Sequence, residues 1–121
     1  MEELLKLMQE TGCGICVDFA HLYARQQGKI DYGQILKMLP KKFHAHFSGI
    51  AYGPKGERRH LHTTPKFFRP LAEALLQTNR DVTLINESPQ PFKDAAMMKR
   101  MVTELIAVKK KTPDYPQADS A

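Results

Sequence analysis

The chain has 121 residues, of which 42% are hydrophobic and 26% charged, a globular composition that excludes wholesale disorder and leaves room for one domain. No apolar run approaches the ~18 residues of a membrane span, and the start MEELLKLMQE lacks the basic and apolar regions of a secretory signal, so a cytoplasmic protein is expected. The net charge of +5 and the pI near 9.3 fit a phosphate-bearing partner.

The first third of the chain predicts two helices with a strand between them. An amphipathic helix is expected over residues 2–9, followed by an apolar strand over residues 14–18. A turn at Gly28 leads into a helix over residues 31–39, with Asp31 as its N-cap.

The rest of the chain alternates strands with helices. The expected elements are a strand over 42–48, a long loop over 49–64, a helix over 65–77 that Thr64 caps and Pro65 begins, a strand over 81–87 and a helix over 92–108. These elements form one domain over residues 1–108. Residues 109–121 contain three lysines, two prolines and small polar residues, which predicts a disordered tail.

Strands that alternate with helices predict an α/β protein with a parallel sheet. The strand runs are short and largely apolar, as expected for strands buried on both faces. No glycine-rich phosphate loop follows any of them, which argues against a dinucleotide-binding fold. Three strands cannot close a (β/α)8 barrel, which needs about 250 residues. Either another chain completes the sheet or the sequence is a fragment.

The two cysteines, Cys13 and Cys16, form a C-x-x-C pair. A redox pair and half of a zinc knuckle are possible functions. Neither has supporting context, because no second pair exists and this one lies in an apolar run. Two small, buried strand residues are the favoured interpretation.

Titratable residues gather around the strand ends. All five histidines lie inside a strand or just past one, and none lies in the four expected helices: His21, His44, His46, His60 and His62. Asp18 ends the first strand and Glu87 ends the third. The C-terminal ends of parallel strands form the active-site face of an α/β barrel, so these side chains should meet on one face.

Strand alternation sharpens this expectation. Residues two apart share a face, so His44, His46 and Ser48 should point one way, while Phe43, Ala45 and Phe47 point toward the helices. Imidazole with carboxylate is a ligand set for zinc, and also for manganese or iron. Three polar residues have simpler expected roles: His62 as a solvent-facing loop residue, and Asp31 and Asp81 as caps or turn residues.

The motifs Val17-Asp18-Phe19-Ala20-His21, His44-Ala45-His46-Phe47-Ser48-Gly49, Gly56–His60 and Asn86-Glu87-Ser88-Pro89 occur in a specific order and spacing. Together they resemble the C-terminal part of endonuclease IV (AP endonuclease family 2), with the archaeal-type branch nearest. This family belongs to the xylose-isomerase-like TIM barrels. The resemblance covers roughly residues 3–108 and implies about three βα units of a (β/α)8 barrel, incomplete as given.

The resemblance also implies a function. Members of the family hydrolyse the DNA backbone 5′ to abasic sites with up to three Zn²⁺ ions, and Mn²⁺ or another divalent ion could replace zinc. It implies that Asp18, His21, His60 and Glu87 are metal ligands, with Asp18 and Glu87 catalytic. One strand histidine is a further ligand, and His44 matches better than His46.

Two parts of the family pattern are missing. The loop carboxylate is absent because Arg58 stands in its place, so either Glu57 substitutes for it or the third metal binds weakly. The family also draws ligands from earlier barrel strands, so these strands or a partner chain are needed. We therefore expect little activity from this segment alone.

The partner implied is double-stranded DNA containing abasic sites, with no membrane. The residues expected to bind it are Lys55, Arg58, Arg59, Lys66 and Ser48, and phosphate contacts of this kind add affinity without sequence information. A solvated basic loop is the alternative. At the level of function, the alternatives are a metal-dependent sugar isomerase or epimerase of the same superfamily and a non-enzymatic truncated remnant.

Overall fold

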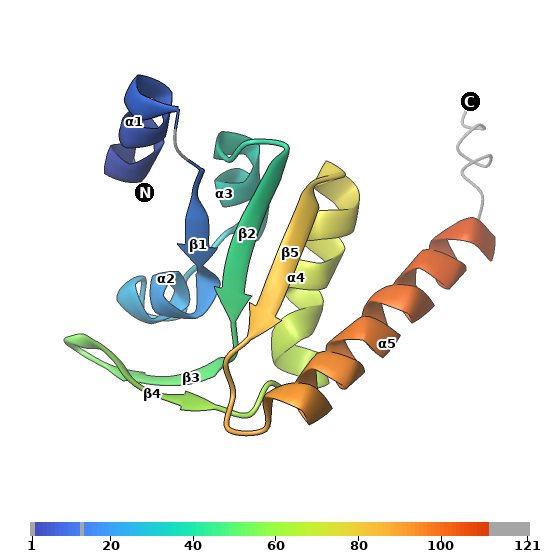
Figure 1. Cartoon of the computed structure of the whole chain (residues 1–121). Coiled ribbons are helices and arrows are strands. Elements are labelled where there is room, and N and C mark those ends of the chain that lie inside the picture. Colours follow the sequence, from blue (N-terminus) through green and yellow to red (C-terminus); the bar gives the residue numbers. More distant parts are fainter. Residues whose placement is uncertain (1, 13, 112–121) are drawn as a thin grey trace.

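The computed structural model describes residues 2–12 and 14–111 and shows an α/β protein built on a three-stranded parallel sheet (Figure 1). The strand order is β1 (Cys16–Asp18), β2 (Lys42–Phe47), β5 (Asp81–Asn86), with β2 in the centre. The helices are α1 (Glu2–Thr11), α2 (Phe19–Arg25), α3 (Tyr32–Met38), α4 (Pro65–Thr78) and α5 (Pro91–Lys111). The expected parallel α/β arrangement is confirmed.

The predicted helix starts are confirmed at atomic detail. The Asp31 carboxylate accepts a hydrogen bond from the Gln34 backbone N–H at 3.2 Å and begins α3. The Thr64 hydroxyl accepts one from the Phe67 N–H, also at 3.2 Å, and Pro65 follows as the first residue of α4. Both side chains satisfy N–H groups that have no partner within the helix.

The hydrophobic core lies between the sheet and the helices. Phe43, Ala45 and Phe47 of β2 are all buried on this face, as the alternation predicted. The Phe47 ring packs against two rings of α4, with centroid distances of 5.4 Å to Phe67 and 5.6 Å to Phe68. Burying each large aromatic side chain contributes about 2–3 kcal/mol, so this face is the main source of stability.

The opposite face of the sheet is open within residues 2–12 and 14–111. Two rows of residues cross it in register: Cys16, His44 and Thr83 form one, and Asp18, His46 and Ile85 the other. Ile85 is 49% exposed there. Parallel sheets are usually covered by helices on both faces. Within the described residues, the outer strands β1 and β5 each pair only with β2, so one edge of each is also unpaired. The expectation that both strand faces are buried is wrong for the described part of the chain.

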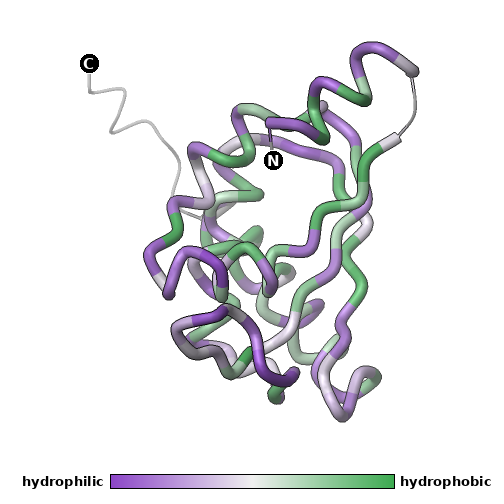
Figure 2. Tube along the Cα trace, turned by 90° about the vertical axis from the view of Figure 1, so that its left-hand side faces the viewer, coloured by the Kyte–Doolittle hydropathy of each residue, from purple (hydrophilic) through white to green (hydrophobic). Residues whose placement is uncertain are grey.

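Helix α1 is amphipathic but, in the part of the chain that is described, buries none of its residues. Figure 2 shows hydrophilic and hydrophobic residues alternating along it. Leu4 and Leu7 are each about half exposed. No described helix is both long and apolar enough to cross a membrane.

The expected loop over residues 49–64 is wrong. The chain instead forms an antiparallel hairpin of β3 (Gly49–Gly53) and β4 (Gly56–Leu61). It extends from the C-terminal end of β2 past α2 (Figure 1). Charged residues fill β4, and their low strand propensity hid the hairpin from sequence reasoning. At its base, a Cβ on Gly49 would collide with the His62 carbonyl oxygen, so glycine permits this close approach.

Two other sequence expectations are corrected. Residues 19–25 form α2, so His21 lies in a helix although no histidine was expected in one. Helix α5 continues to Lys111, so the tail expected from residue 109 does not begin there. Residues 112–121 lie outside the described residues.

Candidate metal centre

Three side chains meet at the C-terminal ends of the three parallel strands. Asp18 ends β1, and His46 lies beside it in register on β2. Glu87 follows β5 directly, and its backbone N–H donates to the Phe47 carbonyl at 3.0 Å. One ligand atom from each of Asp18, His46 and Glu87 lies within 4.8 Å of the other two. Among the residues that the structure describes, this is the one such group of three.

The donor set and spacing of this group fit a divalent ion. Two carboxylates and one imidazole are ligands for zinc, manganese or iron. The His46 Nδ1 and Glu87 Oε2 atoms lie 3.3 Å apart. Two ligands of a tetrahedral ion, each at ~2.1 Å, are separated by about 3.4 Å. Asp18 and His46 are partly buried and Glu87 is exposed, so an ion could reach them from solvent.

His46 belongs to this cluster and His44 does not, the reverse of the sequence ranking. Both lie on the open face, as alternation predicted, and His44 is exposed. The difference is one of level along the strand. His46 is level with Asp18, whereas His44 pairs with Cys16 and Thr83 one row further from the strand ends.

His21 is held beside Asp18 by the start of α2. The Asp18 carboxylate caps this helix, accepting a hydrogen bond from the His21 N–H at 2.9 Å. The His21 Nδ1 atom lies 3.7 Å from the other Asp18 oxygen. One carboxylate therefore both caps the helix and lies next to the His21 imidazole.

His60, from β4, stacks on His21 with ring centroids 5.7 Å apart. Its Nδ1 atom lies 2.7 Å from the Ser48 Oγ atom, and the Ser48 hydroxyl donates to the Gly49 carbonyl at 2.9 Å. A hydroxyl has one proton, and when the Gly49 carbonyl takes it, the tautomer of His60 that donates from Nδ1 satisfies both contacts. The free lone pair of His60 is then on Nε2, the atom available to a metal.

The Ser48 side chain is fully buried, so the expected contact between Ser48 and nucleic acid is wrong. Its hydroxyl forms hydrogen bonds with the Gly49 carbonyl and with the His60 ring. Ser48 is therefore a buried partner of the His60 imidazole.

Glu57 lies near the Asp18 carboxylate. It lines a cavity of about 260 Å³ together with Asp18, His21 and Arg25. The structure thus brings Glu57 to the side of the centre where Asp18 and His21 lie. Whether it takes the role of the loop carboxylate stays a prediction.

The expectation that Cys16 is buried is wrong, because it is exposed on the open face of the sheet. Partial desolvation, with the negative charges of Asp18 and Glu87, raises the pKa of the Cys16 thiol. A protonated thiol is a poor nucleophile and a poor ligand. Cys13 lies outside the described residues.

The basic residues expected to contact phosphate lie in the β3–β4 hairpin and in α4. Lys55 lies in the hairpin turn and Arg58 and Arg59 in β4, all three exposed. Lys66 is exposed in the first turn of α4. The exposed positions permit phosphate contacts, which stay a prediction.

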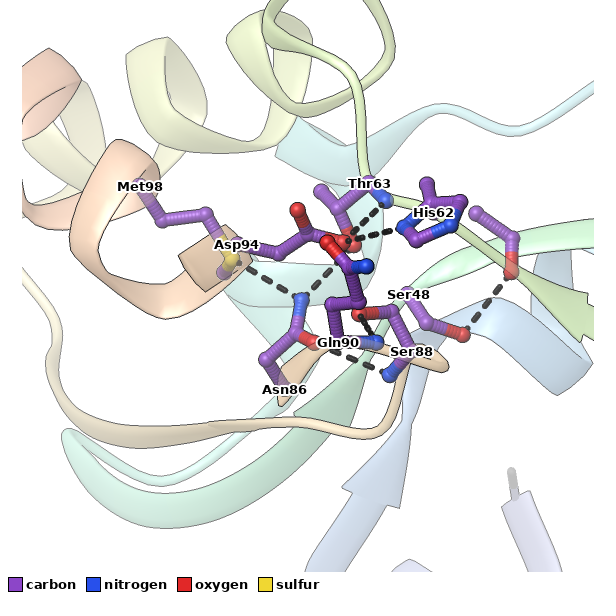
Figure 3. Close-up of polar contacts among 9 residues, drawn as sticks. Ser48, His62, Thr63, Asn86, Ser88, Gln90, Asp94 and Met98 are labelled. Atoms are coloured by element: carbon purple, nitrogen blue, oxygen red, sulfur yellow. Dashed lines mark hydrogen bonds and ion pairs between the residues drawn. The ribbon is translucent and has the colours of Figure 1, made fainter. Parts of the chain in front are cut away.

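Sequence reasoning missed a buried polar network that includes Asn86 and Ser88, the chain neighbours of Glu87 (Figure 3). Its centre is Asp94 of α5, whose Oδ2 atom accepts hydrogen bonds from the Ser88 hydroxyl at 2.6 Å and the Thr63 N–H at 2.9 Å. The His62 Nδ1 atom lies 3.5 Å away, so His62, exposed as expected, also has a partner. The hydrogen bond from Ser88, with smaller contributions from Thr63 and His62, lowers the pKa of Asp94 despite the opposing effect of burial.

The chain is similar to an uncharacterized protein of Methanocaldococcus jannaschii, with 38% identity over 119 residues. The match covers 87% of this chain and 44% of the relative, so the chain spans less than half the length of the relative. No family model and no solved structure matches the chain.

Proposed function

We propose that this chain forms part of the metal centre of an endonuclease IV-like enzyme that hydrolyses the DNA backbone 5′ to abasic sites. The observation that carries the proposal is the convergence of Asp18, His46 and Glu87 from three strand ends. His21 and His60 lie beside this cluster: the His21 backbone N–H donates to Asp18, and the His60 ring pairs with the Ser48 hydroxyl. The sequence motifs that resemble the family are the ones that supply these five residues.

We further propose that the sheet is one part of a (β/α)8 barrel of the xylose-isomerase-like type. Two features support this assignment. The open face carries the row Asp18, His46 and Ile85, and in a closed barrel this face would be the interior. The strands β1 and β5 both have free edges within the described residues, where further strands would pair.

In such an enzyme the residues of this chain would have distinct roles. Asp18 and Glu87 would hold the ions and offset their charge, while His46, His21 and His60 would provide neutral nitrogen ligands. Divalent ions bound there supply Lewis-acid activation of water and of the scissile phosphate. Lys55, Arg58, Arg59 and Lys66 would contact backbone phosphates and position the DNA.

One observation favours a second function. The compact cluster has three ligands, which is enough to hold a single ion. A sugar isomerase or epimerase of the same superfamily, with one divalent ion bound by Asp, His and Glu, would suit this arrangement. The fold alone does not distinguish the two activities.

Two substrates decide between these functions. A protein that contains this segment and matches the relative in length should be assayed with Zn²⁺ or Mn²⁺ on abasic duplex DNA and on a set of ketoses. Incision of abasic DNA without ketose turnover would support the nuclease, and the reverse would support the isomerase. The 121-residue chain alone should have negligible endonuclease activity, because ligands from other strands are required.

A further inference from the structure

The backbone on both sides of Glu87 is fixed by a closed ring of hydrogen bonds (Figure 3). The Asn86 side chain donates to the Thr63 hydroxyl at 2.7 Å and accepts from the Ser88 N–H at 2.9 Å. The Ser88 hydroxyl donates to Asp94 at 2.6 Å, and Asp94 returns to Thr63 through the Thr63 N–H at 2.9 Å. Both chain neighbours of Glu87 are therefore locked by side chains of the ring.

The ring also joins two separate parts of the candidate centre. Thr63 belongs to the segment that runs from His60 at the end of β4 into α4. Ser88 belongs to the turn that carries Glu87 from β5 into α5. Asp94 accepts from both segments with one oxygen atom, so a single carboxylate sets the distance between them.

The ring is built as a rigid, water-poor unit. Thr63, Asn86, Ser88 and Asp94 are each 4–7% exposed, and each has a partner within the ring. A buried network with every member satisfied is stiff, because breaking one bond leaves a costly unpaired group. The carboxylate makes its bonds charge-assisted, which roughly doubles their strength.

We infer that Asp94 is a positioning residue for the candidate metal centre, which it does not touch: it holds Glu87 and the His60 segment at the spacing that binds the ion. This inference rests on the proposed metal centre. It adds that ion affinity depends on a carboxylate of α5 buried behind the site. Outer partners that orient a ligand typically change metal affinity by about 10–100-fold.

The test is a Zn²⁺ titration of the 121-residue chain and its variants against a chromophoric chelator. Asp94→Ala should weaken zinc binding by about 10–100-fold with unchanged stoichiometry. Asp94→Asn should weaken it less, because the amide keeps one acceptor but loses the charge. The control is Asp31→Ala, which removes the exposed carboxylate that caps α3. That variant should lower Tm but keep zinc affinity within about twofold.

A second readout needs no metal. Hydrogen exchange at the Thr63 and Ser88 amides should accelerate in Asp94→Ala and stay unchanged in Asp31→Ala. The Asp94 oxygen accepts directly from the Thr63 N–H. It also holds Ser88 through the Ser88 hydroxyl, while the Ser88 N–H donates to Asn86. This readout reports on the ring and would show that Asp94 orders both segments.

The outcomes separate the inference from the function it rests on. If Glu87→Gln weakens zinc binding and Asp94→Ala behaves like Asp31→Ala, Asp94 is only a structural residue and the inference is overturned. If Glu87→Gln binds zinc as tightly as the unmodified chain, the metal centre itself is wrong. Loss of affinity in both Glu87→Gln and Asp94→Ala, with none in Asp31→Ala, supports the inference.

Discussion

The His46 Nδ1 atom lies 3.3 Å from the Glu87 Oε2 atom, across the neighbouring strands β2 and β5. The contact exists because the backbone of Glu87 continues the ladder, donating to the Phe47 carbonyl at 3.0 Å. The Asp18 carboxylate completes the group from β1. Three strand ends thus bring together ligand types that are far apart in sequence.

The two histidines of β2 should differ in their effect on zinc binding. His46→Ala should weaken Zn²⁺ binding by more than the about 10–100-fold typical of an outer partner, because it removes a ligand of the cluster. His44→Ala is the matched control, since it lies on the same strand and face but outside the cluster. Chelator competition measures both. Equal losses, or a larger loss in His44→Ala, would contradict the assignment.

Ser48→Ala should disturb the centre without touching an ion. It removes the acceptor that holds the proton of His60 on Nδ1, so the ring can adopt the other tautomer. We expect ¹⁵N chemical shifts of His60 to show a mixture of tautomers, with about 10-fold or more weaker zinc binding. Thr78→Ala, which removes a hydroxyl that donates to the Ala74 carbonyl in α4, is the control and should change neither. An unaltered His60 spectrum in Ser48→Ala would refute the tautomer argument.

Charge removal at the centre and at the hairpin should have different kinetic effects. In a longer protein containing this segment, Glu87→Gln should lower turnover of abasic DNA by about 10³-fold or more, equivalent to about 4 kcal/mol. Arg59→Ala should mainly weaken binding and reduce the salt slope by about one unit. Rates at saturating DNA and at low and high salt separate the effects. Near-normal turnover in Glu87→Gln would remove Glu87 from the metal site.

The lowered pKa of Asp94 makes part of the stability depend on pH. A carboxyl whose pKa is lower in the folded state stabilises the fold above its ordinary pKa of about 3.9 and loses this contribution as pH falls further. Asp94→Asn should therefore cost about 1–3 kcal/mol at pH 7 and at pH 5, and less at pH 3. Urea unfolding measures the difference. A cost that stays constant down to pH 3 would contradict a stabilising ionised carboxylate.

The sequence was sufficient to predict the three strands of the parallel sheet because their signals are local. Alternation in β2 separated His44 and His46 from Phe43, Ala45 and Phe47. The choice between His44 and His46 was not local. It depends on register with Asp18 of another strand, which periodicity cannot provide.

The parts that sequence reasoning missed have no local signal. The hairpin strand β4 contains Glu57, Arg58 and Arg59, which are more typical of a loop. Asp94 resembles any acidic residue in the first turn of a helix. Its role comes from Thr63 and Ser88, which the fold brings to it from two other segments.

The most direct test of the metal centre is diffraction at the zinc absorption edge from crystals of this chain grown with Zn²⁺. We expect an anomalous peak within about 2.0–2.3 Å of one atom each of Asp18, His46 and Glu87. The same peak should be absent from crystals of Glu87→Gln. Zinc bound elsewhere, with no peak between these three side chains, would contradict the account.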